Sequence, residues 1–240
     1  MKHSDTPRAP HPPESVLRSL RVLDTCTAAN AIETFNAQMR NEGYCSNNGL
    51  RCHFPELGSM FGFALTLRIR SANPPMEGGT YADRTDWWET LESLPQPRIV
   101  VIQDMDKTPG TGAFVGEVHA AILQAMGCVG VITNGAVRDL PAARKRRFHL
   151  FSHSISPSHA YVHVIDVGMP VELGSLRVAT GDMLLCDEHG VVRIPPALAE
   201  EIPQIAARKR AEDREVLEFC RSAEFSREGL EGLLAKGKVR

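Results

Sequence analysis

The sequence predicts a layered α/β fold, and two observations lead to this prediction. The first is a strand, a glycine-rich loop, a helix and a second strand between residues 98 and 133. This order is typical of one right-handed crossover unit in a parallel sheet. The second is a series of short β-like segments after this unit, with helical segments flanking the β-rich part. A sheet covered by helices follows from the two together.

The N-terminal region is expected to be a tail followed by two short helices. Residues 1–13 are rich in proline and polar residues, so we expect a disordered tail. Leucines between residues 17 and 23 have the spacing of one helix face. Asp24 is placed to cap a second helix, which would end near residue 35.

The next hundred residues contain the elements on which the fold class rests. Residues 43–55 have the composition of a loop, residues 61–69 that of a strand and residues 83–94 that of a helix. The crossover unit is expected to comprise a strand at 98–103, a glycine-rich loop at 109–112, a helix at 117–126 and a strand at 129–133. The helix face expected to contact the sheet carries Val118, Ile122 and Ala125.

The C-terminal half adds strands and ends in helices. Strands are expected at residues 148–152, 160–167, 176–178, 183–186 and 191–194. A charged amphipathic helix covers 196–220, where Pro203 either kinks the helix or separates two helices. We therefore expect one domain at 14–220 and a C-terminal extension at 221–240.

Charge and composition narrow the class of protein. The net charge is −2 with both signs mixed along the chain, so nothing predicts the basic face of a nucleic-acid-binding protein. A basic cluster at 144–147 is interpreted as a solvated loop or helix end rather than a phosphate-binding patch. No apolar run approaches the ~20 residues needed to span a bilayer, and no signal peptide is recognisable, so a cytoplasmic protein is expected.

Cysteine and glycine patterns exclude several site classes. None of the six cysteines forms a Cys-x-x-Cys pair, and Cys128 and Cys186 lie in apolar runs typical of buried positions. There is no Gly-x-Ser-x-Gly, Walker-type or Gly-x-Gly-x-x-Gly motif. The sequence therefore does not predict a nucleotide cofactor or a serine nucleophile.

The first candidate site is the helix start at Gly116, Glu117, Val118 and His119. The first amides of a helix have no acceptor within the helix, and the helix dipole adds partial positive charge there. Such an end can bind a carboxylate or a phosphate. An ordinary turn between strand and helix explains the same residues, because glycine-rich turns of this kind are common.

The second candidate site follows the next strand, where residues 134–139 end in Arg138 and Asp139. The carboxyl ends of parallel strands meet at one edge of a sheet, so both sites should lie together. The planar guanidinium of Arg138 matches a carboxylate, and Asp139 offers an oxygen ligand for Mg²⁺ or Mn²⁺. A surface ion pair is the alternative interpretation.

Together the two sites suggest chemistry on a small 2-oxo acid. Its carboxylate would lie on the amides of Val118 and His119 and on Arg138, and its carbonyl oxygen would face a metal ion held by Asp139. Glu117 would order metal-bound water that transfers a proton. This arrangement suits cleavage of a carbon–carbon bond that leaves a pyruvate enolate, by retro-aldol cleavage or by decarboxylation.

Two further groups of residues are assigned no site. The histidines at 149, 153, 159 and 163 lie in expected strands and loops, so their spacing of four does not favour a zinc site. The charged residues of 208–215 are typical of a solvated helix face, from which one acid could complete a site in a neighbouring subunit.

These motifs resemble those of the RraA-like family of pyruvate aldolases and decarboxylases. The acid at Glu117, twenty intervening residues and then Arg138-Asp139 match the acid-x20-Arg-Asp signature of that family. The segment GCVGVITNGAVRD at 127–139 resembles its strand and loop, and segments at 169–178 and 181–192 resemble its later strands. The resemblance covers roughly residues 16–220.

The resemblance implies a β/β/α swivelling-type fold, a homotrimer or a dimer of trimers, and a site between subunits. It implies that Gly116 to His119 bind the substrate carboxylate, that Arg138 binds the 2-oxo acid and that Asp139 ligates Mg²⁺ or Mn²⁺. Glu117 would contact the metal through water. The substrates implied are 4-hydroxy-4-methyl-2-oxoglutarate and oxaloacetate.

The alternative function within this family is that of a non-catalytic protein that modulates ribonuclease E. Such members lack the acid after the arginine, so the presence of Asp139 favours an enzyme. Four positions depart from the aldolase pattern. Asn134 replaces an aspartate, His119 an apolar residue, Glu117 a shorter acid and Ala142 an acidic residue found in some members.

Overall fold

The computed structural model describes residues 11–46, 49–76 and 85–238. In chain order, its strands are β1 (Tyr44–Ser46), β2 (Arg51–Cys52), β3 (Met60–Arg70), β4 (Arg98–Asp104), β5 (Ala113–Val115), β6 (Cys128–Val137), β7 (His149–Ile155), β8 (His163–Val167), β9 (Val171–Leu173), β10 (Leu176–Val178), β11 (Met183–Asp187) and β12 (Gly190–Ile194). The helices are α1 (Glu14–Arg21), α2 (Thr25–Glu33), α3 (Asp86–Glu92), α4 (Glu117–Ala125), α5 (Leu140–Lys145), α6 (Ile202–Arg221) and α7 (Arg227–Lys238), with short 3₁₀ turns at Pro55–Leu57 and Pro196–Leu198.

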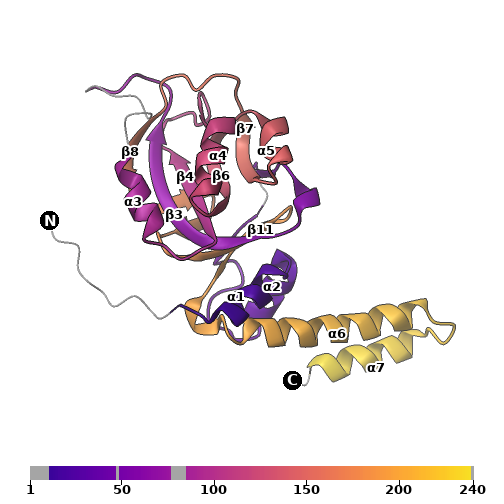
Figure 1. Ribbon diagram of the computed structural model, residues 1–240. Helices are drawn as coiled ribbons and strands as arrows, with labels where there is room; N and C mark the ends of the chain where they lie inside the picture. Colours follow the sequence, from indigo (N-terminus) through magenta and orange to yellow (C-terminus); the bar gives the residue numbers. More distant parts are fainter. Residues whose placement is uncertain (1–10, 47–48, 77–84, 239–240) are drawn as a thin grey trace.

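The described residues form a mixed α/β fold around one large sheet (Figure 1). Its strand order is β1-β12-β11-β3-β4-β6-β7-β2, with β5 beside β6 and β8 beside β3. The central strands β3, β4, β6 and β7 run parallel, whereas β11 and β12 are antiparallel to their neighbours. The expected crossover unit is confirmed, because α4 connects the parallel neighbours β4 and β6.

The sheet curves around an apolar interior. Its two end strands are β1 and β2, which follow each other closely in the chain, so the two edges of the sheet lie near each other. Residues 43–55 were expected to be a loop, but they supply both of these edge strands. The interior contains side chains from the central strands and from the β9–β10 hairpin, including Ile99, Val101, Phe151, Val171 and Leu176.

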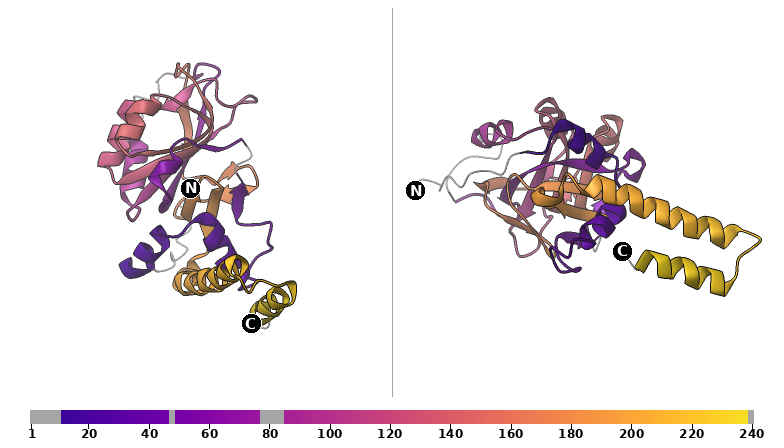
Figure 2. Two further views of the ribbon diagram at one scale, coloured as in Figure 1. Left: turned by 90° about the vertical axis from the view of Figure 1, so that its right-hand side faces the viewer. Right: turned by 90° about the horizontal axis from the view of Figure 1, so that it is seen from below.

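Helices cover the sheet in two groups. α3, α4 and α5 pack on one side, where Trp87, Leu91, Leu123 and Ala143 belong to one buried cluster. α1, α2 and α6 pack on strands at the other end of the sheet (Figure 2). The start of α2 agrees with the sequence-based prediction, because the side chain of Asp24 accepts a 2.7 Å hydrogen bond from the amide of Thr27 and caps the helix.

The prediction of which face of α4 contacts the sheet is wrong. Val118 is 71 % exposed, whereas Ala120 and Leu123 are buried against the sheet. A helix of this length contains more than one set of apolar residues with helical spacing, and the contact with β6 selects between them. β6 also extends to Val137, beyond the expected end at residue 133, so Arg138 and Asp139 directly follow a strand.

The C-terminal helices form a hairpin that extends away from the domain (Figures 1 and 2). Pro203 lies in the first turn of α6 after the 3₁₀ turn at 196–198, so it separates two helical segments and does not kink one. Residues 1–10 of the expected tail and residues 83–84 of an expected helix lie outside the described residues. Among the described helices, none is long and apolar enough to cross a bilayer.

Candidate active site

Strand pairing brings the two candidate segments together. β5 lies beside the end of β6, with Val115 opposite Val137. The amide of Arg138 donates a 2.9 Å hydrogen bond to the carbonyl of Val115. Gly116, which precedes the first residue of α4, therefore lies beside Arg138. The sequence-based expectation that both segments share one edge of the sheet is confirmed by this geometry.

Asp139 connects the two segments. Its Oδ2 accepts a 3.0 Å hydrogen bond from the backbone amide of Glu117, the first residue of α4. The Nε atom of Arg138 lies 3.5 Å from the same oxygen. Asp139 has a left-handed backbone (φ 55°, ψ 39°) and occupies the N-cap position of α5. A carboxylate thus already lies at the positive end of the α4 dipole.

Gly116 makes this close approach possible. A Cβ atom at this position would lie 2.5 Å from Oδ2 of Asp139 and 2.8 Å from Nε of Arg138. Contacts this short are not tolerated without movement of one of the groups. The backbone φ of Gly116 is −129°, so the requirement for glycine is one of space and not of backbone conformation.

The carboxylate of Glu117 faces a basic residue that the sequence analysis assigned to a solvated cluster. Nη2 of Arg146 lies 3.9 Å from Oε1 of Glu117, and the two side chains are 38 % and 55 % exposed. Helix α5 positions Arg146, because Asp139 is the N-cap residue of this helix and Arg146 is its C-cap residue. Residue spacing does not predict this contact, which depends on how α4 and α5 pack together.

His119 and Val118 differ in their surroundings. The His119 ring stacks on Phe114, with ring centroids 5.0 Å apart. Burial, and then the positive charge of Arg138, lower the pKa of His119, so the imidazole is neutral near pH 7. The side chain of Val118 is exposed, which leaves its backbone as the part of this residue that can contribute to anion binding.

The histidines at 149, 153, 159 and 163 do not form one group. His149 is buried on β7 and stacks on Phe151, and His163 lies at the start of β8 with its Nδ1 2.7 Å from the carbonyl of Tyr161. In the described part of the chain, no group of three or more His, Cys, Asp or Glu side chains is arranged to hold a metal ion.

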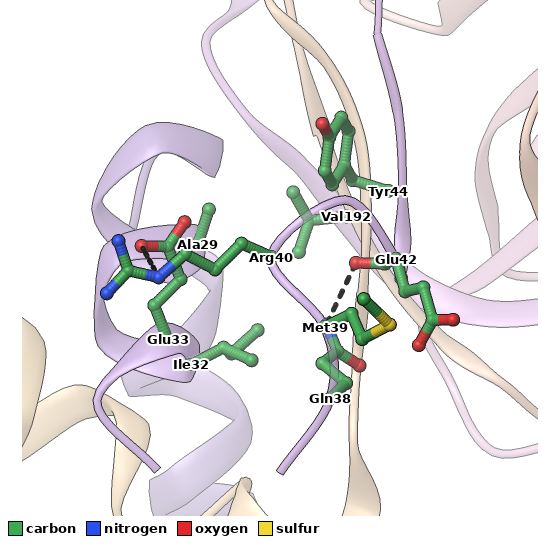
Figure 3. Close-up of a pocket in the computed structure, with 10 residues that line it drawn as sticks. Ala29, Ile32, Glu33, Gln38, Met39, Arg40, Glu42, Tyr44 and Val192 are labelled. Carbon is green, nitrogen blue, oxygen red and sulfur yellow. Dashed lines mark hydrogen bonds and ion pairs between the residues drawn. The ribbon is translucent and has the colours of Figure 1, made fainter. Parts of the chain in front are cut away.

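Two cavities lie beside α2, away from the candidate site. One has a volume of about 230 Å³ and is lined by residues of α2, β1 and β12. The other, of about 40 Å³, is adjacent and shares Glu33 and Arg40, whose side chains form a 3.7 Å ion pair (Figure 3). None of the residues predicted for the active site lines either cavity.

Comparison with known proteins decides the family. The sequence pattern of the RraA-like family, described as Aldolase/RraA, matches residues 23–193. This chain belongs to the RraA-like family. A Halalkalibacterium halodurans protein named "Putative 4-hydroxy-4-methyl-2-oxoglutarate aldolase" is 26% identical over 118 residues, which are 49% of this chain and 56% of that protein. The alignment thus spans little more than half of this relative.

Solved structures show the same fold. An uncharacterized protein from Pseudomonas syringae has a TM-score of 0.72 at 19% identity, over 98% of this chain and 100% of that one. RraAS2 of Streptomyces coelicolor, described as an unusual member of the RNase ES inhibitor RraA protein family, has a TM-score of 0.65 at 22% identity. That alignment covers 86% of this chain and 99% of RraAS2. The layered α/β fold expected for an RraA-like protein is confirmed.

The departure from the family pattern at Asn134 has a structural explanation. Its side-chain oxygen accepts a 2.7 Å hydrogen bond from the amide of Asp104, and its side-chain nitrogen donates a 3.0 Å bond to the carbonyl of the same residue. An ionised aspartate has no donor for the second bond. Asn134 therefore connects the carboxyl ends of β4 and β6, which position the candidate site.

The acidic residues of the site fit a magnesium-type ion. Such ions keep several water ligands and often take only one or two protein carboxylates. Asp139 is 44 % exposed and contacts the helix through Oδ2. Glu117, whose backbone amide contacts Asp139, adds a second carboxylate. Asp139 and Glu117 therefore offer carboxylate oxygens of the kind that Mg²⁺ or Mn²⁺ takes in proteins.

Proposed function

We propose that the protein is a divalent-metal-dependent lyase that cleaves a carbon–carbon bond of a 2-oxo acid to give pyruvate enolate. The observation that supports this most is the contact of Asp139 with the α4 amide of Glu117, beside Arg138. A cation-binding carboxylate, a carboxylate-binding guanidinium and a helix N-terminus thus meet at one point. The name of the H. halodurans relative supports 4-hydroxy-4-methyl-2-oxoglutarate as one substrate.

Each residue has a separate task in this proposal. Arg138 and the amides of Val118 and His119 bind the carboxylate and orient the 2-oxo group. Asp139 would hold Mg²⁺ or Mn²⁺ directly, and the ion, when bound, supplies positive charge that stabilises the enolate. Glu117 orders a water molecule that returns a proton to carbon 3 of the enolate.

The same residues suit two reactions. Retro-aldol cleavage of 4-hydroxy-4-methyl-2-oxoglutarate and decarboxylation of oxaloacetate both break a bond one carbon away from the 2-oxo group. In both, the electron pair of the broken bond passes to the carbonyl. In the retro-aldol reaction the 4-hydroxyl gives its proton to the ordered water as its carbon becomes the carbonyl of a second pyruvate, and in the decarboxylation the distal carboxylate leaves as carbon dioxide. The transition states therefore develop negative charge at the same oxygen, which the site would stabilise.

The test is pyruvate release from both compounds with Mg²⁺ and with excess EDTA, for wild type and for Asp139→Ala. We expect metal-dependent release by the wild type and a loss of more than about a hundredfold in the variant, with loss of Mn²⁺ binding. Glu172→Ala, an exposed acid on β9, is the matched control. Metal-dependent turnover by Asp139→Ala would overturn the assignment of this residue.

We also propose that the protein assembles as a homotrimer or a dimer of trimers. The exposed apolar side chains of the α6–α7 hairpin support this, since Leu217, Phe225 and Leu234 are 55%, 50% and 47% exposed. Among the described residues, no group of three or more His, Cys, Asp or Glu side chains is arranged to hold a metal ion, and a site completed by a neighbour is consistent with this. Sedimentation equilibrium would test it against three or six times the 26.4 kDa mass of the chain.

A further inference from the structure

The basic run at 144–147 directs one of its side chains at the candidate site. Arg144 faces away, because its Nε lies 3.0 Å from Glu56 and its guanidinium lies over the Phe54 ring. Arg147 has a positive φ of 56° at the end of the helix. Arg146 is the residue of this run that contacts Glu117.

The backbone of Arg146 is held in place. Its carbonyl accepts a 3.0 Å hydrogen bond from the side chain of Gln124 on α4, and its amide donates to the carbonyl of Ala142 at 3.1 Å. α4 and α5 therefore lie side by side, and the side chain of Arg146 extends back along them toward the start of α4. Its guanidinium lies beside the carboxylate of Glu117, the residue whose backbone amide donates to Asp139.

The charges at this point balance in a way that depends on the ligand. Arg138 and Arg146 contribute two positive charges, and Glu117 and Asp139 contribute two negative charges. A divalent cation would leave two positive charges uncompensated. A 2-oxo acid with two carboxylates restores neutrality, whereas a monocarboxylate leaves one positive charge.

We propose that Arg146 is a specificity-determining residue that binds the carboxylate distal to the 2-oxo group, so that the site selects dicarboxylic 2-oxo acids. The inference rests on the proposed lyase function. Arg138 and the α4 amides bind the carboxylate beside the 2-oxo group, which pyruvate also has. Arg146 adds a second carboxylate contact, which only the dicarboxylic substrate can use.

The longer acid at Glu117 belongs to the same arrangement. In the absence of ligand, Glu117 is the partner of Arg146 and neutralises it. When the distal carboxylate takes that place, Glu117 is released to order water at the reacting carbon. Binding of the correct substrate thus frees the residue that transfers the proton.

The experiment compares Arg146→Gln with Arg144→Gln, a matched change in the last turn of α5. Both proteins are assayed with Mg²⁺ for cleavage of 4-hydroxy-4-methyl-2-oxoglutarate, whose distal carboxylate stays in the product, and pyruvate binding is measured separately as its inhibition constant. We expect Arg146→Gln to raise the KM for this substrate by about 10- to 100-fold, with kcat and the inhibition constant of pyruvate changed less than about threefold. Arg144→Gln should leave all three values within about twofold.

A charge-retaining variant separates recognition from folding. Arg146→Lys should recover part of the KM effect, and thermal unfolding of all variants should match the wild type because the side chain is partly exposed. An unchanged KM in an active enzyme, or equal weakening of 4-hydroxy-4-methyl-2-oxoglutarate and pyruvate binding, would overturn the role of Arg146 alone. Failure of the wild type to release pyruvate from any dicarboxylic 2-oxo acid would overturn the lyase function and this inference with it.

Discussion

The carboxylate of Asp139 lies at the N-terminus of α4, where it accepts the backbone hydrogen bond of Glu117 at 3.0 Å. The same residue is the proposed direct metal ligand. In the protein without bound metal, the Asp139 carboxylate therefore occupies the position at the N-terminus of α4 where a substrate carboxylate would otherwise bind. This relationship makes the effect of removing Asp139 opposite in sign for metal-free and metal-loaded protein.

In metal-free protein, Asp139→Ala is expected to strengthen carboxylate binding. The substitution frees the Glu117 amide and removes a negative charge, so pyruvate in excess EDTA should bind about two- to fivefold more tightly than to wild type. NMR titration of the α4 amides measures this. Asp139→Asn, which keeps an acceptor for the amide but not the charge, should lie between the two. Weaker pyruvate binding by Asp139→Ala would contradict the occupancy of this position.

Gly116→Ala is expected to disrupt catalysis more than folding. The new methyl group would meet Oδ2 of Asp139 at 2.5 Å and displace it from Arg138 and from the helix. Misplacement of this kind can reduce turnover by about a hundredfold. Gly232→Ala on α7 is the control, because its added Cβ meets no atom within 4 Å. That change should leave turnover intact and stabilise the helix by ~0.5–1 kcal/mol. Full activity of Gly116→Ala would show that Asp139 has room to move.

Acid should destabilise the protein through His149. Burial, followed by the charge of Arg147, lowers the pKa of His149 to about 4 from 6.5. The unfolded chain therefore binds the proton first, so the stabilisation is complete above about pH 6.5 and is lost as the pH falls toward 4. The shift corresponds to about 3 kcal/mol at most.

Urea unfolding between pH 7 and pH 4 measures this dependence. His149→Leu should reduce its slope. A wild-type free energy of unfolding that does not fall over this range would be inconsistent with a neutral, buried His149.

Arg98 is expected to be essential for stability. Its buried guanidinium donates to the carbonyls of Leu94, Met126 and Glu92, which end the segments of α3 and α4. Arg98→Met leaves these acceptors without the donor and should cost on the order of 3 kcal/mol of unfolding free energy. Arg98→Lys, with a single ammonium group, should cost less. A change below about 1 kcal/mol for the methionine variant would show that water replaces the arginine.

Much of the fold was determined by local sequence. The apolar run from residue 98 specified a buried parallel strand, and the glycine-rich loop before Glu117 specified the start of α4. Both signals are local, because the β-branched apolar run and the glycine-rich turn lie within or next to the elements that they predict. The order of strands and loops also indicated that the two candidate segments lie together, since consecutive parallel strands place their carboxyl ends at one edge. The spacing between Glu117 and Arg138 matched the pattern of the RraA-like family.

Tertiary structure alone decided the remaining features. The short edge strands β1 and β2 exist because distant strands supply their hydrogen-bond partners. The buried face of α4 depends on the sheet beneath it, so Val118 is exposed and Ala120 is buried. The contacts of Glu117 with Asp139 and Arg146 depend on how two helices pack side by side. Such contacts are set by long-range packing, which the periodicity of a short segment does not encode.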